Sequence, residues 1–546
     1  MKRILYILFF AAAALFLSCE RSEPDAGAQQ KVLTGYKELL QAYDEGKLFK
    51  QVQTSADANV VVFEDGSTVS VPKSSFEIHD HTTSPVPVIE VVPGSSWWSI
   101  DGKLTGIIVN SSALSKEQAK PVYVYFDSKT LYMYISNREV LKFNSQILED
   151  EKKDEEEEKK EQEEIARRQN IPVVYIDTGG KGIYDKENYV DGTITIKDPE
   201  MLYSDVEEFS AAMGIRGRGN STWSFPKKPW KVKLKEKASL LGMPADKEWC
   251  LLANYADRTL LRNITAMHLS EICGFPWTPR MHSVEVYLNN EYQGVYTLCE
   301  HKKVSADRVD IDVDAGDVYL EIEEQQDETT CWWTGMGVPM MFSDPEEPSS
   351  EQLTKIKKMF DDFENALRNK NYSETAGYPK YIDVDSFIDY YIVQELTKNI
   401  DGNLRKSSFI TIENGGKMVM YHLWDFDLTL GNAGYFGSDV GSGYENYWIK
   451  RDRWFPYLFR DPAFVDRLQQ RWAELYPELS KVPDFITLQA KYLDKAKDRN
   501  FQKWSIHESV DWVMFPSLGS YEKELEYLKE FYTRRLGWLN VELNKL

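Results

Sequence analysis

The stretch Gly214-Ile215-Arg216-Gly217-Arg218-Gly219-Asn220-Ser221-Thr222-Trp223 has the composition of a glycine-rich turn. A second stretch, Trp230-Lys231-Val232-Lys233-Leu234, follows it closely. Apolar and polar side chains alternate in the second stretch, which indicates a strand with Lys231 and Lys233 on the same face. Glycines let a backbone approach a phosphate group and direct N–H groups toward it, and a lysine on the next strand adds positive charge. A plain hairpin loop followed by a solvent-facing edge strand is the alternative interpretation.

Strand patterns surround this turn, and helix patterns follow it. Strand-like apolar runs occupy residues 173–176, 193–196, 284–288, 294–298 and 318–322. Further along, apolar residues recur at steps of three and four in residues 352–367, 384–397, 462–476 and 521–543, as expected of amphipathic helices. A β-rich part followed by an α-rich part predicts an α+β fold with a cleft between the two parts.

Three aspartates are the strongest candidates for chemistry in this cleft. Asp401 follows the helix pattern 384–399, whereas Asp425 and Asp427 lie in Trp424-Asp425-Phe426-Asp427, after the strand pattern 419–423. Carboxylates that alternate to one face of a strand, beside apolar side chains, are costly to bury without a cation, and Mg²⁺ prefers oxygen ligands. We therefore expect a divalent-cation site here. The alternative is a pair of surface aspartates in a β-turn.

A helix is predicted to begin near Asp257 and to end at Gly274. Asp257 suits the N-cap position, where its carboxylate would accept hydrogen bonds from backbone N–H groups. Arg262 stands one turn further on, either as an anion ligand or as the partner of a structural ion pair.

The first residues have the pattern of a bacterial lipoprotein leader. Lys2 and Arg3 precede an apolar run, and Phe16-Leu17-Ser18-Cys19 resembles a lipobox in which the cysteine carries the lipid. We expect a signal peptide at 1–18 and a polar tether at 19–31. The lipid on Cys19 would then hold the chain at a membrane of the cell envelope, facing the periplasm or the cell surface. A plain cleaved leader is the alternative.

Two further segments precede the glycine-rich turn. Residues 32–146 combine one helix pattern with several short strand patterns, including a hairpin at Asp65-Gly66, and predict a small β-rich module. Trp97 and Trp98 in this module are candidates for stacking on a glycan, although aromatic pairs beside a turn usually pack in the core of a small domain. Residues 147–169 are rich in charge and predict a solvated helical spacer. The remaining residues, 170–546, form the main domain.

Composition excludes several classes of protein. The 546 residues include 65 Lys and Arg against 87 Asp and Glu, a net charge of −22. Phosphate contacts need clustered positive charge, so a general nucleic-acid binder is excluded. After residue 18 no stretch approaches the roughly 20 apolar residues of a membrane-spanning helix. Beyond Cys19, the spacing of the four remaining cysteines contains no Cys-x-x-Cys, so it favours no zinc site and leaves one or two disulfides open without fixing a pairing.

The main domain resembles the spore coat protein H (CotH) kinase family. The resemblance covers residues 171 to 546 and rests on the order of five blocks, namely Arg218-Gly219-Asn220-Ser221, Lys227-Lys228-Pro229-Trp230, Asp257 to Asn263, Asn289 to Tyr296, and Trp424-Asp425-Phe426-Asp427. It implies an atypical protein-kinase-like fold of two lobes, which binds ATP with Mg²⁺ or Mn²⁺. It also implies transfer of the γ-phosphoryl group to a serine or threonine of a protein acceptor.

The resemblance also assigns roles to individual residues. Asp401 would orient or deprotonate the acceptor hydroxyl, and Asp425 would hold the metal, with Asp427 as a second ligand or a supporting partner. The turn from Arg218 through Gly219 and Asn220 to Ser221 would contact the nucleotide. One of Lys228, Lys231 and Lys233 would pair with the phosphates, and Glu300 would pair with that lysine.

The family pattern is broken after Asp401. Protein kinases place a metal-binding Asn five residues beyond the catalytic Asp, whereas this position is Lys406. Either Asn403 substitutes as a ligand, or a single metal binds, or the chain is a degenerate nucleotide binder. The alternative function is therefore a surface lipoprotein that binds a polysaccharide or a protein partner. A hydrolase with paired carboxylates is less favoured, because Asp425 and Asp427 are too close in sequence to act across a substrate.

Overall fold

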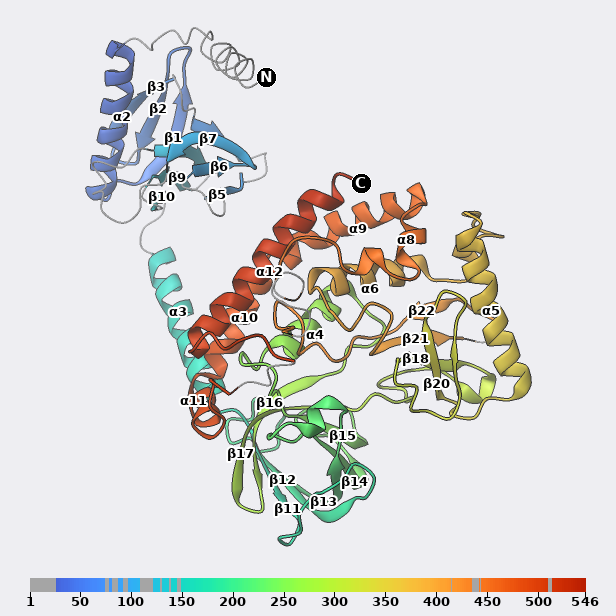
Figure 1. The fold of residues 1–546 in the computed structure, drawn as a ribbon. Coiled ribbons are helices and arrows are strands. Elements are labelled where there is room, and N and C mark those ends of the chain that lie inside the picture. Colours follow the sequence, from blue (N-terminus) through green and yellow to red (C-terminus); the bar gives the residue numbers. More distant parts are fainter. Residues whose placement is uncertain are drawn as a thin grey trace, which may run out of the picture. The chain divides into compact units, whose positions relative to one another are not determined.

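The computed structural model describes residues 26–546, except for 74–77, 81–86, 92–96, 109–120, 128–129, 137–138, 145–148, 414, 435–440, 442 and 509–512. The predicted signal peptide, Cys19 and the start of the tether therefore lie outside the described residues. The chain divides into two compact units, one reaching to Glu161 and the other spanning Gln162–Leu546 (Figure 1). Among the described residues, no helix is long and apolar enough to cross a membrane.

The smaller unit consists of one helix and three small sheets. Its sheets have the strand orders β1-β2-β3, β10-β9-β8-β4 and β5-β6-β7. The predicted hairpin at Asp65-Gly66 is present between β2 and β3, and Trp98 is buried against Val122. The elements are α2 (Ala26–Asp44), β1 (Phe49–Thr54), β2 (Ala58–Phe63), β3 (Thr68–Pro72), β4 (Ile78–Asp80), β5 (Ile89–Val91), β6 (Trp97–Ile100), β7 (Lys103–Ile108), β8 (Pro121–Phe126), β9 (Thr130–Ile135) and β10 (Val140–Asn144).

The charged segment forms the helix α3 (Glu149–Arg168), as predicted. Its last turn belongs to the larger unit. There Arg167 donates a hydrogen bond to the carbonyl of Glu200 at 2.8 Å, and the Arg168 guanidinium lies over the ring of Tyr492. These contacts tie the end of the helix to the larger unit.

The β-rich part of the larger unit closes into a barrel with the strand order β11-β12-β13-β14-β15-β17-β16. On β14, Trp230, Val232 and Leu234 point into the barrel core, so the intervening Lys231 and Lys233 point outward. The strands are β11 (Val173–Asp177), β12 (Val190–Lys197), β13 (Glu208–Gly217), β14 (Trp230–Ala238), β15 (Asp246–Leu252), β16 (Met281–Leu288) and β17 (Glu291–Glu300).

A second sheet and the helices complete the larger unit. The sheet has the order β19-β20-β18-β21-β22, and the largest apolar core lies among this sheet and the helices. Figure 1 shows the barrel at one end of this unit and α6, α9 and α12 at the other. The elements are β18 (Val318–Ile322), β19 (Cys331–Trp333), β20 (Pro339–Asp344), β21 (Ser408–Ile412), β22 (Met418–Met420), α4 (Arg262–Cys273), α5 (Ser350–Arg368), α6 (Val384–Leu396), α8 (Phe455–Leu458), α9 (Pro462–Leu479), α10 (Val482–Tyr492), α11 (Asp494–Lys503) and α12 (Tyr521–Leu543), with short 3-10 turns η1 (Ser221–Ser224), η2 (Val313–Ala315), η3 (Tyr378–Lys380) and η4 (Ile449–Arg451).

The mixture of sheets and helices is consistent with the predicted α+β class, and two local expectations need correction. The helix predicted near Asp257 begins at Arg262, although it ends at Gly274 in a left-handed conformation as expected. Strand β22 stops at Met420, so Asp425 and Asp427 lie in an irregular segment and not at the end of a strand. Asp425 has a φ of +67°, which breaks the extended backbone that strand alternation requires.

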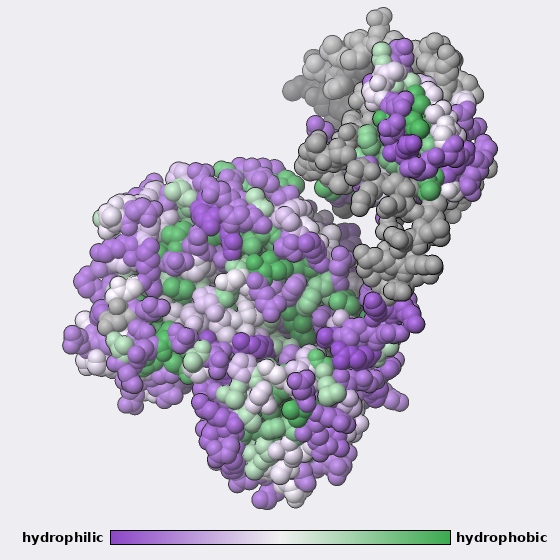
Figure 2. Space-filling model, turned by 180° about the vertical axis from the view of Figure 1, so that it is seen from behind, coloured by the Kyte–Doolittle hydropathy of each residue, from purple (hydrophilic) through white to green (hydrophobic). Residues whose placement is uncertain are grey.

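On the face drawn in Figure 2, the larger unit is mainly hydrophilic, and apolar residues form several separate patches. This pattern is normal for a folded domain in contact with water.

Candidate functional site

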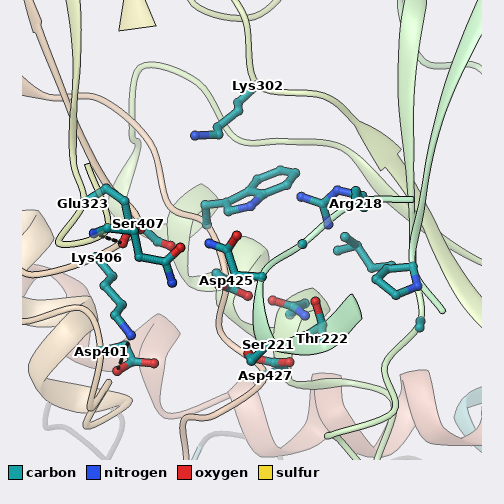
Figure 3. A pocket seen from close by; sticks show the side chains of 18 of the residues that line it. Arg218, Ser221, Thr222, Lys302, Glu323, Asp401, Lys406, Ser407, Asp425 and Asp427 are labelled. Carbon is teal, nitrogen blue, oxygen red and sulfur yellow. Dashed lines mark hydrogen bonds and ion pairs between the residues drawn. The ribbon is translucent and has the colours of Figure 1, made fainter. Parts of the chain in front are cut away.

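A pocket of about 290 Å³ opens in the larger unit, lined by segments that are distant in the sequence. The turn after β13, the loop after β17 and the segment after β18 contribute to its walls. The loop after α6 and the segment that follows β22 also line it. Figure 3 shows Asp425 between Lys406 and Arg218 in this view, with Asp401 beside Lys406.

The glycine-rich turn forms one wall of the pocket. Arg218, Gly219, Asn220 and Ser221 all line it. Gly219 has a φ of +81°, and a Cβ atom there would lie 2.2 Å from Oγ1 of Thr222. Only glycine fits this position without displacing the turn. The Arg218 guanidinium lies over the ring of Trp424, 5.6 Å from its centroid.

Asp425 and Asp427 both line the pocket. The backbone between them is held by Asn263, whose Oδ1 accepts a hydrogen bond from the N–H of Phe426 at 2.8 Å. The positive φ of Asp425 is rare for a residue with a side chain. Strained backbone of this kind persists where the surrounding structure fixes it, and it gathers at functional sites.

The surroundings of both carboxylates disfavour their charged form. Burial raises the pKa of Asp425, and the charge of Asp401 adds to that effect, although Arg218, Lys406 and Lys302 oppose it. Asp425 is also in contact with solvent. Burial also raises the pKa of Asp427 well above its usual range, helped by the nearby charge of Asp425. A cation at this point would relieve both effects.

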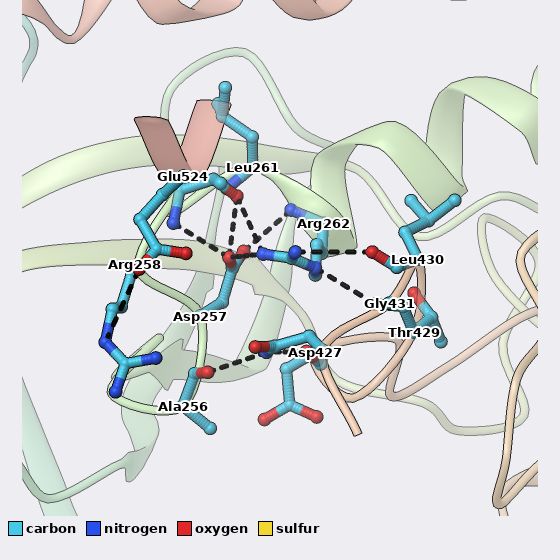
Figure 4. A network of polar contacts seen from close by, with 12 residues as sticks. Ala256, Asp257, Arg258, Leu261, Arg262, Asp427, Thr429, Leu430, Gly431 and Glu524 are labelled. Carbon is cyan, nitrogen blue, oxygen red and sulfur yellow. Dashed lines mark hydrogen bonds and ion pairs between the residues drawn. The ribbon is translucent and has the colours of Figure 1, made fainter. Parts of the chain in front are cut away.

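A buried ion pair supports this segment from behind (Figure 4). The side chains of Asp257 and Arg262 are each 1% exposed, and Oδ1 of Asp257 lies 2.6 Å from Nη1 of Arg262. Arg262 also donates to the carbonyl of Thr429 at 3.0 Å. Of the two predicted roles for Arg262, the structure shows the structural ion pair. Asp257 accepts the backbone N–H of Arg262 at 2.8 Å, so it caps the helix from outside the N-cap position.

Asp401 and Lys406 lie on the loop that follows α6, and both line the pocket. Nζ of Lys406 is 3.9 Å from Oδ1 of Asp401. The loop after Asp401 is held by Tyr390, whose hydroxyl donates to the carbonyl of Gly402. An ammonium group therefore stands at the position where the kinase pattern calls for an amide ligand.

Lys302 lines the pocket from the loop after β17, Glu321 from β18 and Glu323 from the segment just after β18. Lys302 forms an ion pair with Glu321, and its ammonium lies 4.6 Å from the ring centroid of Phe409. Burial raises the pKa of Glu321, although Lys302 opposes this. Burial also raises the pKa of Glu323 to about 7, and the charge of Glu321 contributes.

The three predicted lysines do not line the pocket. Nζ of Lys228 donates to the carbonyl of Trp223 at 2.7 Å. Lys231 and Lys233 both pair with Glu248, at 3.1 Å and 3.3 Å, because alternation on β14 directs them to the outer face of the barrel.

Glu300 and Asn403 also lie elsewhere. The Glu300 carboxylate pairs with the guanidinium of Arg280 at 3.1 Å, and not with one of the predicted lysines. Nδ2 of Asn403 donates to Asp452 at 2.8 Å, and Asn403 is absent from the pocket lining. The predicted pairing of Glu300 is therefore wrong, and Asn403 is not placed to act as a ligand in the pocket.

Sequence reasoning missed Lys302, Glu321 and Glu323. A signal was present for Glu321, because it is a lone charge inside the apolar run Val318–Ile322. Lys302 carried no comparable signal, since it lies in a charged stretch just past the hairpin. Lys406 stands out in the sequence as the residue that departs from the kinase pattern.

The donor set suits a phosphate ester bound through one divalent cation. Within the described residues, no group of three or more His, Cys, Asp or Glu side chains forms an assembled metal site. Mg²⁺ commonly binds through one or two carboxylates and completes its shell with water and phosphate oxygens. Asp425 and Asp427 supply the carboxylates. Arg218, Lys302 and Lys406 supply the positive charge that phosphate groups require.

In a comparison with protein-family models, residues 215–539 match the model described as CotH kinase protein. The match includes Arg218, Gly219, Asn220 and Ser221 of the turn and the aspartates Asp401, Asp425 and Asp427, and it covers more than half of the chain. Comparison with the curated proteins gives no match.

Proposed function

The chain belongs to the CotH kinase protein family, and on this basis we propose that it is a protein kinase. It would bind ATP with Mg²⁺, or with Mn²⁺, and transfer the γ-phosphoryl group to a serine or threonine hydroxyl of a protein acceptor. The observation that carries this proposal is one pocket whose lining includes Asp401, Asp425 and Asp427, the cationic side chains of Arg218, Lys302 and Lys406, and the glycine-rich turn. A two-lobed kinase-like arrangement, with the barrel and the helical part on either side of the pocket, belongs to the same proposal.

Each group in the pocket has a role in the proposed reaction. Asp425 and Asp427 would hold the divalent cation, which neutralises charge on the phosphate oxygens. Asp401 would hold the acceptor hydroxyl and accept its proton. Arg218 and Lys302 would contact the phosphates, and the tight turn at Gly219 would bring backbone N–H groups close to them. Phosphoryl transfer needs mainly such positioning and charge neutralisation.

We further propose that a single metal ion suffices. Asn403 is bonded to Asp452 outside the pocket, so the second metal of many kinases would lack its amide ligand. Lys406 lies beside Asp401 and brings a fixed positive charge to the same region. Two cations so close together would repel each other.

The proposed setting is the bacterial cell envelope, with a lipid on Cys19 as the anchor. ATP is scarce beyond the inner membrane, so phosphorylation would act before export, use residual nucleotide, or use another phosphoryl donor. A surface lipoprotein that binds a polysaccharide or a protein partner, without catalysis, is the second candidate. The position of Asn403 outside the pocket is the observation that favours it.

The test is metal-dependent binding and transfer by the mature chain. We expect ATP with Mg²⁺ to raise its melting temperature, and label from [γ-³²P]ATP to appear on a generic protein acceptor. Asp425→Asn should abolish the metal-dependent shift and lower transfer by about 10²–10³-fold, the usual effect of removing one group that stabilises charge in the transition state. Asp385→Asn is the matched control, because Asp385 pairs with Arg467 on the surface.

Two outcomes would decide between the candidates. Absence of nucleotide binding with both Mg²⁺ and Mn²⁺ would overturn the kinase assignment. Binding of nucleotide without transfer, in wild type and control alike, would favour the second candidate.

A further inference from the structure

Two cysteines face each other inside the larger unit, in a place that the proposed reaction does not use. Cys250 on β15 and Cys299 on β17 are directly opposite in the antiparallel pairing of these strands. Both are fully buried, with 0% exposure. They belong to one apolar cluster that also contains Trp277 and Trp424.

Opposed residues of an antiparallel pair have the spacing of a disulfide. Their side chains point to the same side of the sheet, and their Cα atoms lie about 4.5–5.5 Å apart. Disulfides join cysteines whose Cα atoms are about 4.4–6.8 Å apart. A bond between Cys250 and Cys299 therefore needs little movement of the backbone.

The other two cysteines of the described chain are placed differently. Cys273 ends the helix α4 and is buried in the main helical core. Cys331 lies on β19, and its thiol donates to the carbonyl of Glu328. Neither belongs to the cluster that holds Cys250 and Cys299, so the fold selects one pairing where the sequence spacing left several open.

The groups around Cys250 favour a disulfide over a free thiol at this position. Nδ1 of His301 lies 3.5 Å from its sulfur, and Nε2 of His301 lies 2.8 Å from Nζ of Lys231. A hydrogen bond from Cys299 lowers the pKa of Cys250 well below its usual range, with help from Arg218 and His301 and against the effect of burial. The reduced protein thus buries an ionisable sulfur in an apolar cluster, and a disulfide removes that charge.

We propose that Cys250 and Cys299 form an intramolecular disulfide when the chain folds in an oxidising compartment. The formation of this bond does not require the proposed kinase activity. The predicted leader would deliver the chain to such a compartment, where disulfides form and persist.

The oxidant is an external disulfide, and the exchange is balanced. One cysteine thiolate attacks the external disulfide and releases a first thiol. The second cysteine then attacks the resulting mixed disulfide and releases a second thiol. Two electrons pass to the oxidant, and the protons of the two cysteines end on the two released thiols. Since folding buries both sulfurs, the exchange precedes closure of the barrel.

The bond would join β15 to β17 behind the pocket. The segment that it closes contains α4, β16 and the buried pair of Asp257 and Arg262. Cross-links that close long segments restrict the unfolded chain, so they favour the folded state. Trp424, in the same cluster, carries the Arg218 guanidinium on its ring, so the bond also braces the pocket wall.

The experiment is refolding of the mature chain from denaturant in a buffer of oxidised and reduced glutathione. After alkylation in denaturant without a reducing agent, we expect intact mass to show two unmodified cysteines that become reactive only after reduction. Peptide mapping should give one cross-linked species that contains Cys250 and Cys299. Thermal unfolding of this material should shift to lower temperature when a reducing agent is added.

Three variants serve as controls. Cys273→Ser should keep the cross-linked peptide, because Cys273 lies in another core. Cys250→Ala and Cys299→Ala should each lose it, and the paired variant Cys250→Ala/Cys299→Ala should lose the response of its melting temperature to the reducing agent. Alkylation of all four cysteines after refolding, or a cross-link through Cys273 or Cys331, would overturn the proposal. The wild-type measurement decides the matter even where a variant folds poorly.

Discussion

Glu323 is a carboxylate on the pocket wall with a side chain that is only 7% exposed. Its pKa is raised from 4.5 to about 7 by burial, with a contribution from Glu321. A folded-state pKa above the unfolded value means that the protonated form is the one the fold prefers. The contribution of Glu323 to stability is therefore fully present below about pH 4.5, and it is lost as the pH rises through about 7.

We expect Glu323→Gln to gain stability relative to wild type as the pH increases. The shift corresponds to a change of up to about 3 kcal/mol in the relative free energy of unfolding between pH 4.5 and 8. Melting temperatures of both proteins across this range would measure it. Glu324→Gln is the control, since Glu324 is more exposed and pairs with Arg405. A constant difference between Glu323→Gln and wild type at every pH would contradict the expectation.

Lys406 provides a second test at the scale of one residue. Removing its ammonium should weaken binding of Mg²⁺-ATP by about 10–100-fold, the usual cost of losing a hydrogen bond to a charged group. Isothermal titration calorimetry of Lys406→Ala would measure the change. The neighbouring Arg405→Ala should bind nearly as wild type does, because Arg405 bonds to Glu324 and does not line the pocket. Equal losses in the two variants would mean that the loop, and not the Lys406 charge, matters.

At this scale the sequence predicted the acidic half of the site better than the basic half. Asp401, Asp425 and Asp427 stand out because carboxylates beside apolar residues carry a strong signal. The choice of lysine depends on which face of β14 turns into the barrel, and alternation alone does not determine that. Lys302 reaches the pocket only because the chain turns after β17, a turn that no local pattern marks.

At the scale of elements, the ion pair of Asp257 and Arg262 joins the start of α4 to the segment that carries the pocket aspartates. We expect Arg262→Ala to lower the free energy of unfolding by about 3–5 kcal/mol, because it leaves a buried carboxylate without its partner. Urea denaturation would measure the loss. Arg467→Ala removes an ion pair at the surface, where such pairs contribute about 0–1 kcal/mol. A loss below about 1 kcal/mol in Arg262→Ala would show that the pair does not support the fold.

The periodicity of apolar residues predicted most helices and strands of the larger unit. It failed where tertiary contacts determine the backbone conformation. The helices α5, α6, α9 and α12 follow their apolar spacing closely. The segment from Trp424 to Asp427 also alternates, yet the N–H of Phe426 bonds to Asn263 and Asp425 takes a left-handed conformation. Closure of the barrel rests on parallel pairing of β11 with β16, strands that are over a hundred residues apart. No local pattern reports such a contact.

At the scale of the whole molecule, the two units have separate apolar cores. The core of the smaller unit draws on α2 and on strands β1, β2, β3, β8, β9 and β10, whereas the cores of the larger unit consist of its own residues. Units with separate cores can fold independently. The last turn of the linking helix contacts the larger unit through Arg167 and Arg168.

We therefore expect a fragment of residues 149–546 to fold and to bind Mg²⁺-ATP with the affinity of the mature chain. Differential scanning calorimetry should show one transition for the fragment, at the temperature of one transition of the mature chain. A shorter fragment that starts at residue 173 should melt at a lower temperature, because it lacks the contacts of Arg167 and Arg168. Loss of nucleotide binding in the fragment 149–546 would mean that the smaller unit takes part in the site. Retention of a polysaccharide by the mature chain but not by this fragment would instead assign that function to the smaller unit.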